Sequence, residues 1–147
     1  MAMIRTAEAA WEGAFLDGKG KMKLESGALE GDFSYRTPME NEGSGTSPEE
    51  LLAAAHASCF SMSLPGRLPS VAHPPKRIHT EARVYFDRAG EGYAISRIDL
   101  RAEAEVPGIN EEVFQEQAES AKHNCPVSKA LTGVEIGMKA RLVHPVG

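Results

Sequence analysis

Hydrophobic and polar residues alternate along several segments of the chain, which predicts β-strands with one buried and one solvated face. The longest segment, RIHTEARVYFDRAGEGYAISRIDLRAEAEV at about residues 77–106, predicts two strands that turn at Ala89-Gly90-Glu91-Gly92. Five apolar residues in its second half alternate with charged ones: Ile98, Leu100, Ala102, Ala104 and Val106. The segment VEIGMKARLV alternates in the same way and predicts a final strand at about 134–143.

Shorter strands are predicted at about residues 7–36. AAWEGAFLDGKGKMKLESGAL indicates two strands joined by a turn at Asp17-Gly18, and DFSYR, which ends at Arg36, indicates a third. The next segment, TPMENEGSG, is polar and rich in glycine, so it is expected to be a loop.

A helix is predicted at about residues 48–64, and its start is marked by the local sequence. Ser47 is a good N-cap, Pro48 suits the first helical position, and Glu50 completes a capping box. The rest of the segment consists mostly of strong helix formers with almost no charge, so we expect the helix to be buried nearly all round. Pro65 then ends it.

Two more helices follow the long hairpin. Asn110 can cap a helix at about 111–122, and Pro126 can start a short one at about 126–132. Strands that are segregated around a buried helix predict an α+β fold rather than an alternating α/β fold. A chain of 147 residues is most simply one domain, spanning 1–147.

Composition narrows the class of protein. The apolar fraction of 41% and the charged fraction of 25% are typical of a soluble globular protein. A net charge of −5, without a dense Lys/Arg cluster, argues against a nucleic-acid partner. No apolar run suits a membrane span or a signal peptide, and the chain has only two cysteines rather than a disulfide framework. We therefore expect a cytoplasmic protein that does not bind membranes.

The two cysteines, Cys59 and Cys125, are the candidate chemistry. Cys59 lies inside the predicted central helix, and Cys125 directly precedes a helix start whose backbone N–H groups favour a thiolate. Taken alone, each is as easily a buried and inert residue. Glu49 projects within about 80° of Cys59 on the same helix stripe, but ten residues of helix rise about 15 Å. Glu49 and Cys59 of one chain therefore cannot meet in one small site.

Two motifs, GTSPEELLAAAHASCFSM and NCPVSKAL, closely resemble the paired cysteine motifs of the osmotically inducible protein C and organic hydroperoxide resistance (OsmC/Ohr) family. AWEGAFLDGKG and AEVPGIN resemble the OsmC branch, and the resemblance runs from about residue 7 to the last strand. It implies a thiol peroxidase that acts on organic hydroperoxides. It also implies an intertwined homodimer with antiparallel sheets around buried central helices.

The resemblance also implies roles for individual residues. Cys59 matches the peroxidatic cysteine, Cys125 the resolving cysteine, and Glu49 the active-site glutamate. The family's arginine comes from the segment before the helix, where Arg36 is the candidate and Arg5 the second choice. A Cys59–Cys125 disulfide would be reduced by an external dithiol, such as dihydrolipoamide or a lipoylated protein. No cofactor or metal is implied.

The residues around Cys59 predict a preference among peroxides. The helix carries several apolar side chains near the thiol, some of which are expected to line the approach to the sulfur: Leu52, Ala55, Phe60 and Met62. An apolar pocket favours bulky organic peroxides over hydrogen peroxide, because each buried CH₂ group contributes about 0.8 kcal/mol.

Two other hypotheses stay open from the residues alone. His56 and Cys59, together with His123 and Cys125, supply enough ligands for a tetrahedral zinc site in a non-enzymatic module. Otherwise His56 would be a packed helical histidine with both ring nitrogens satisfied, and His123 a solvated residue near a helix C-terminus. A third hypothesis is a thiol redox sensor, which is oxidised once and does not turn over.

Overall fold

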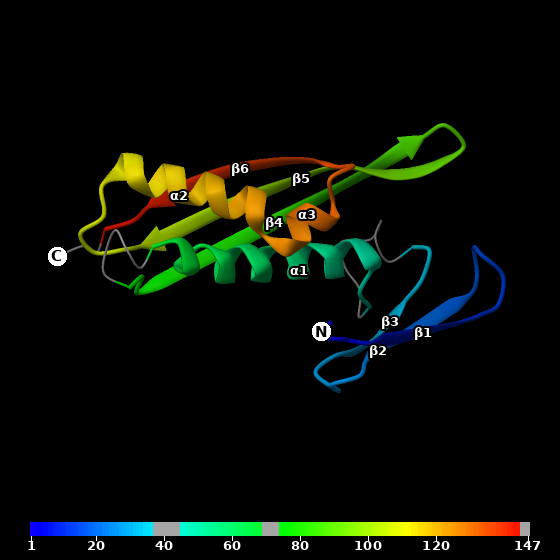
Figure 1. The fold of residues 1–147 in the computed structure, drawn as a ribbon. Coiled ribbons are helices and arrows are strands. Elements are labelled where there is room, and N and C mark those ends of the chain that lie inside the picture. Colours follow the sequence, from blue (N-terminus) through cyan, green and yellow to red (C-terminus); the bar gives the residue numbers. More distant parts are fainter. Residues whose placement is uncertain (37–44, 69–73, 145–147) are drawn as a thin grey trace. The chain divides into compact units, whose positions relative to one another are not determined.

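The computed structural model describes residues 1–36, 45–68 and 74–144, and its fold is α+β, as predicted (Figure 1). The sequence predicted one domain; in the structure the chain forms two compact units, Met1–Leu51 and Leu52–Gly147. The loop predicted after Arg36 lies largely outside the described residues.

The first unit holds a three-stranded antiparallel sheet in the order β1-β2-β3. Its strands are β1 (Ala7–Glu12), β2 (Lys19–Leu24) and β3 (Glu30–Phe33). The predicted turn contains Gly18, whose N–H donates to the carbonyl of Ala14 at 2.6 Å, whereas β3 starts and ends earlier than predicted. Every residue of β1 is exposed, and Met22 is the only buried apolar side chain among the unit's described residues. The sheet therefore has little core of its own in a single chain.

Helix α1 spans Pro48–Ser63 and starts where the sequence predicted. The hydroxyl of Ser47 accepts a hydrogen bond from the backbone N–H of Glu50 at 3.1 Å, which is the expected N-cap. The carboxylate of Glu50 accepts instead from the hydroxyl of Thr46, at 2.8 Å, so the second half of the capping box takes a different partner. A short 3₁₀ turn, η2 (Pro65–Arg67), follows the helix.

The second unit is built on a mixed sheet in the order β4-β5-β6. Its strands are β4 (Arg77–Ala89), β5 (Gly92–Glu105) and β6 (Glu135–Leu142). The hairpin turns where predicted, and Gly90 adopts φ +62°, a left-handed conformation that glycine reaches without steric cost. β6 pairs parallel to β5, so this sheet is not purely antiparallel as predicted. Parallel neighbours require a long crossover, which helices α2 (Glu111–Asn124) and α3 (Pro126–Ala130) supply.

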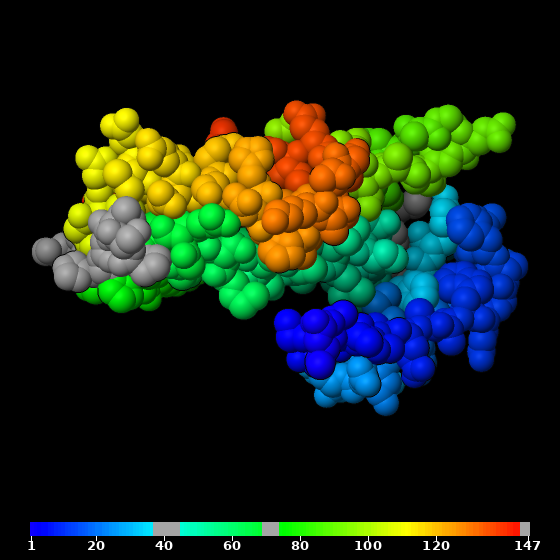
Figure 2. Space-filling model, viewed as in Figure 1, coloured from blue at the N-terminus to red at the C-terminus, as the bar shows by residue number. Residues whose placement is uncertain are grey.

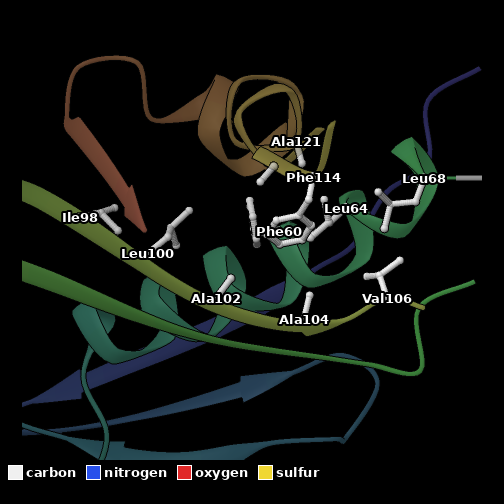
Figure 3. Packing of buried hydrophobic residues seen from close by; sticks show 11 residues of the cluster. Phe60, Leu64, Leu68, Ile98, Leu100, Ala102, Ala104, Val106, Phe114 and Ala121 are labelled. Carbon is white, nitrogen blue, oxygen red and sulfur yellow. The ribbon is translucent and has the colours of Figure 1, made fainter. Parts of the chain in front are cut away.

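One face of the β4-β5-β6 sheet carries the core. The five alternating residues predicted from the second half of the hairpin are all buried, with exposed fractions of 5% or less. Phe60 of α1, Leu64 directly after α1 and Phe114 of α2 point toward these strand residues (Figure 3). The opposite face is charged and includes the ion pair between Arg97 and Asp99. Burial of one face and solvation of the other explain the period-two pattern.

The expectation that α1 is buried nearly all round is wrong for a single chain. Its buried residues His56, Cys59 and Phe60 follow the i, i+3, i+4 spacing of one helix stripe. The other side is exposed, with Met62 at 75%, and beyond the first turn the exposed residues are Ala54, Ala55, Ser58 and Met62. The low charge of α1 therefore does not indicate burial within one chain. One side of the helix is instead an exposed, weakly polar surface.

Helices α2 and α3 also start where predicted. The side chain of Asn110 accepts from the backbone N–H groups of Glu112 at 2.8 Å and Val113 at 3.3 Å. Helix α3 begins at Pro126, directly after Cys125. Within the described ranges, none of the helices is long and apolar enough to cross a membrane.

Candidate active site

The two cysteines meet inside the second unit. Cys59 lies on the buried stripe of α1 and is 9% exposed, whereas Cys125 lies between α2 and α3 and is 0% exposed. Both are free thiols, and their side chains hydrogen-bond to each other. In Figure 2 the atoms of α3 (orange) lie against those of α1 (green), in line with the contact between His56 and Ser128. The fold thus brings together the two residues that the sequence singled out.

The local sequence fixes the position of Cys125. Its N–H donates to the carbonyl of Ala121 at 2.9 Å and closes α2, while its own carbonyl accepts from Lys129 at 3.0 Å and opens α3. Pro126 has no N–H and disfavours helical conformation in the residue before it, so α2 cannot continue through this point. Cys125 accordingly has extended backbone, with ψ 127°. The chain break between the two helices therefore falls on the cysteine itself.

The surroundings of Cys59 favour its protonated form. Burial is the main cause that raises the pKa of the Cys59 thiol, and the hydrogen bond to Cys125 raises it further. Donation from the backbone N–H of Val127 and from the side chain of Ser63 lowers it but does not compensate. Among the described residues, the groups that act most strongly on this thiol include no cation. A Cys59 thiolate therefore needs a further source of positive charge.

The surroundings of Cys125 act in the opposite direction. Burial is the largest effect and would raise the pKa of this thiol, but several hydrogen bonds outweigh it and lower the pKa. They involve the Cys59 side chain, both the backbone and the hydroxyl of Ser128, and the backbone of Val127. Thiols that interact this closely titrate as a pair rather than singly. The hydrogen bond between the two side chains therefore favours a proton on Cys59 and ionisation of Cys125.

His56 lies one helical turn before Cys59 on the same stripe of α1 and is fully buried, at 0% exposed. Its Nε2 lies 2.8 Å from the hydroxyl oxygen of Ser128. Its Nδ1 is buried and has no hydrogen-bond partner among the described residues, so the expectation that both ring nitrogens are satisfied is wrong for Nδ1. Burial lowers the pKa of His56, which keeps the imidazole neutral.

The proposed zinc ligands do not come together. His123 lies in the last turn of α2, where the sequence placed it, with its side chain 67% exposed and 3.2 Å from the carboxylate of Glu119. Across residues 1–36, 45–68 and 74–144, no group of three or more His, Cys, Asp or Glu side chains could hold a metal ion. The structure thus forms a pair of thiols rather than a four-ligand cluster.

Glu49 and Arg36 belong to the first unit. Glu49 lies in the first turn of α1, and its Oε2 is buried without a hydrogen-bond partner among the described residues. Arg36 is exposed and is the last described residue before the gap at 37–44. Arg36 therefore does not reach this oxygen of Glu49, and the active-site roles of both residues stay predictions.

Only part of the predicted apolar lining is available to a substrate. Phe60 is 0% exposed and belongs to the core shown in Figure 3, so it cannot line an open approach to Cys59. Leu52 is half-buried, whereas Ala55 and Met62 are exposed on the outer side of α1. An approach along α1 would therefore use these three residues.

Sequence reasoning placed Ser63 on the helix stripe of Cys59 but gave no role to Ser63 or Ser128, which both act on the thiols. Ser63 follows Cys59 by one helical turn, and Ser128 lies inside the quoted NCPVSKAL motif. The i, i+4 spacing explains why Ser63 reaches the Cys59 thiol. Ser128 was harder to find, because its second partner, His56, lies 72 residues away.

Comparisons with known proteins agree with the motifs. Residues 41–139 match the family model described as OsmC-like protein. The chain is 42% identical over 132 residues to Peroxiredoxin OsmC of Escherichia coli (strain K12), covering 89% of this chain and 92% of that protein. It is 31% identical over 110 residues to the organic hydroperoxide resistance protein of Xanthomonas axonopodis pv. citri (strain 306), covering 69% and 72%.

The fold agrees as well. The solved structure of an organic hydroperoxide resistance protein OsmC from Legionella pneumophila matches with a TM-score of 0.72 at 22% identity, covering 97% of this chain and 100% of that one. The resemblance inferred from the two cysteine motifs is thereby confirmed. The chain belongs to the OsmC-like protein family.

Proposed function

We propose that this chain is a thiol peroxidase that reduces organic hydroperoxides to alcohols. Its similarity to proteins named peroxiredoxin and organic hydroperoxide resistance protein supports peroxidase activity in general. The observation that carries the finer proposal is the hydrogen-bonded pair of free thiols, Cys59 and Cys125. Two adjacent thiols can close a disulfide, which protects an oxidised cysteine from further oxidation.

The reaction proceeds in two steps at sulfur. The Cys59 thiolate forms an S–O bond with the peroxide while the O–O bond breaks, and the alkoxide leaves as an alcohol after taking a proton. This leaves a sulfenic acid on Cys59. Cys125 then attacks the Cys59 sulfur, an S–S bond forms, and the departing hydroxide takes a proton and leaves as water. An external dithiol, for which we propose a lipoyl group, reduces the disulfide.

Exposure distinguishes the two thiols as first nucleophile. Cys125 is 0% exposed, so a peroxide cannot reach it before Cys59, which is 9% exposed. Hydrogen bonds around Cys125 lower the pKa of its thiol, which suits a residue that attacks the oxidised Cys59. We therefore assign the peroxidatic role to Cys59 and the resolving role to Cys125.

We propose that Arg36 supplies the positive charge that a Cys59 thiolate needs, with Arg5 as the alternative. A guanidinium near Cys59 would favour the thiolate and donate hydrogen bonds to the departing alkoxide. Glu49 would hold this guanidinium in a bidentate pair. The buried Oε2 of Glu49 supports this role, because a buried carboxylate oxygen is costly until a donor reaches it.

We infer that the working protein is a homodimer with shared active sites. The exposed side of α1 and the poorly covered β1-β2-β3 sheet are surfaces that a second copy could bury. Glu49 and Cys59 lie on one stripe of α1 but about 15 Å apart. Two α1 helices packed antiparallel across a twofold axis would bring Glu49 of one chain near Cys59 of the other.

Subunit mixing tests the shared site. Cys59→Ser and Glu49→Ala homodimers are each expected to be inactive, whereas their mixture recovers activity because one site per mixed dimer regains both residues. Random exchange makes about half of the dimers mixed, so about a quarter of wild-type activity is expected. Peroxide consumption after subunit exchange or co-expression measures it.

The matched control is a mixture of Cys59→Ser with Cys125→Ser. These two thiols meet within one chain, so every site of that mixed dimer stays defective. Recovery in the first mixture but not in the second supports sharing. Absence of recovery in both mixtures would place each site within a single chain.

Steady-state turnover tests the substrate class. With dihydrolipoamide as reductant, kcat/KM for tert-butyl or cumene hydroperoxide is expected to exceed that for hydrogen peroxide by about tenfold or more, because two buried methylene-sized groups contribute roughly 1.6 kcal/mol. Equal values would reject an apolar pocket. A single oxidation without catalytic consumption would favour the redox sensor.

A further inference from the structure

A chain of polar side chains leads from His56 to the reacting thiols. His56 Nε2 lies 2.8 Å from Ser128 Oγ, and the side chains of Ser128 and Cys59 both lower the pKa of Cys125 by hydrogen bonding. All four residues are buried, with exposed fractions between 0% and 9%. The two-step reaction described above assigns no role to either His56 or Ser128.

The unpartnered nitrogen of His56 determines which group donates and which accepts in each of these hydrogen bonds. A buried N–H without an acceptor is rarer and more costly than a buried acceptor without a donor. Because Nδ1 is buried without a partner among the described residues, the single proton of the neutral ring belongs on Nε2. His56 therefore donates to the Ser128 oxygen, and the Ser128 proton is directed to Cys125. Hydrogen bonds then run from His56 through Ser128 to the sulfur.

We propose that His56, acting through Ser128, holds Cys125 as the thiolate that closes the disulfide, and so favours disulfide closure over further oxidation of Cys59. This inference rests on the proposed peroxidase function. Once Cys59 is a sulfenic acid, the Cys125 sulfur forms the S–S bond and the S–O bond breaks. The hydroxide takes a proton from solvent and leaves as water. A second peroxide competes for the same sulfenic acid, so the speed of closure decides the product.

The expected size of the effect follows from thiolate chemistry. A hydrogen bond donated to a thiolate raises the fraction ionised, while nucleophilicity falls by only about half as much on a logarithmic scale. The net result is faster attack as long as Cys125 is not already fully ionised. The other hydrogen bonds that act on this sulfur come from Cys59, Val127 and the Ser128 backbone, so part of the stabilisation remains when the hydroxyl is removed.

Ser128→Ala and Ser128→Thr form the first test pair. After a pulse of tert-butyl hydroperoxide, acid quenching and intact-mass spectrometry follow the sulfenic, disulfide and sulfinic forms. Ser128→Ala is expected to slow disulfide closure by about tenfold, to leave first oxidation within about twofold, and to raise the sulfinic fraction. Ser128→Thr keeps the hydroxyl and is expected to restore closure.

His56→Gln and His56→Leu form the second pair. The Gln amide nitrogen lies near the position of Nε2 and can still donate to Ser128, whereas Leu fills the space without a donor. We expect His56→Gln to close the disulfide at nearly the wild-type rate. We expect His56→Leu to close it as slowly as Ser128→Ala. The double variant His56→Leu/Ser128→Ala should be no slower than either single variant, because both changes interrupt the same chain.

The outcomes separate this inference from the proposed function. A merely structural role would slow both steps together and lower the thermal midpoint without changing the ratio of disulfide to sulfinic product. If wild-type protein turns over while Ser128→Ala closes the disulfide at the wild-type rate, the inference is wrong and the peroxidase stands. Slow closure in His56→Gln, equal to that in His56→Leu, also overturns donation by His56. Failure of the wild-type protein to form the disulfide at all would instead overturn the proposed function.

Discussion

Replacement of Cys59 by serine is expected to abolish peroxide reduction, with kcat/KM for cumene hydroperoxide falling at least about a thousand-fold. A serine hydroxyl stays protonated at neutral pH and is a far weaker nucleophile than a thiolate. Cys125 cannot replace it, because that thiol is 0% exposed and peroxide cannot reach it. Consumption of the peroxide with dihydrolipoamide measures the loss.

The same Cys→Ser change at Cys125 is the matched control for Cys59→Ser. It removes one sulfur from the same buried pair but leaves the first nucleophile in place. At least one equivalent of peroxide should therefore be consumed by Cys125→Ser and none by Cys59→Ser. Substantial consumption by Cys59→Ser would mean that the attacking group lies elsewhere.

Cys125→Ser is expected to lose multiple turnover while its first oxidation continues. The hydrogen bond that Cys59 donates to Cys125 is, after burial, the next cause that raises the pKa of Cys59, so its removal should not slow the first step. Without a resolving thiol, the sulfenic acid meets a second peroxide and becomes sulfinic or sulfonic acid, a gain of about 32 or 48 Da. Intact-mass spectrometry after excess peroxide detects these products.

Wild-type protein under the same conditions should instead lose about 2 Da as the Cys59–Cys125 disulfide forms. Dihydrolipoamide should return the wild-type protein to its reduced mass but should not reverse the oxidised variant. Normal turnover of Cys125→Ser with dihydrolipoamide would contradict the resolving role that we assign to Cys125.

The features that the sequence predicted well depend on near neighbours in the chain. Ser47 and Pro48 start α1, and Asn110 starts α2, because capping satisfies the N–H groups of the next residues. Pro126 fixes the break at Cys125 because it lacks an N–H. The alternation along β5 predicted its buried face because successive strand residues point to opposite sides.

The two cysteine motifs were predicted from the chain as well, since each is a continuous stretch of residues. These motifs suffice to identify the family without any knowledge of the fold, and the comparisons confirm it. The roles of Glu49 and Arg36 were carried over from the same resemblance. They stay predictions, because they concern contacts between a helix end and other segments rather than a local pattern.

Tertiary structure alone decided the features that join distant segments. Residue pattern does not state strand direction, so the parallel pairing of β6 with β5 follows from the α2–α3 crossover between them. The low charge of α1 suggested full burial, yet one chain covers only the stripe that contains His56 and Cys59. The hydrogen bond between His56 and Ser128 joins residues 72 positions apart, and the fold brings them together by packing α1 against α3. Local sequence sets backbone conformation and burial period, but the environment of each thiol depends on which distant groups the packed core places beside it.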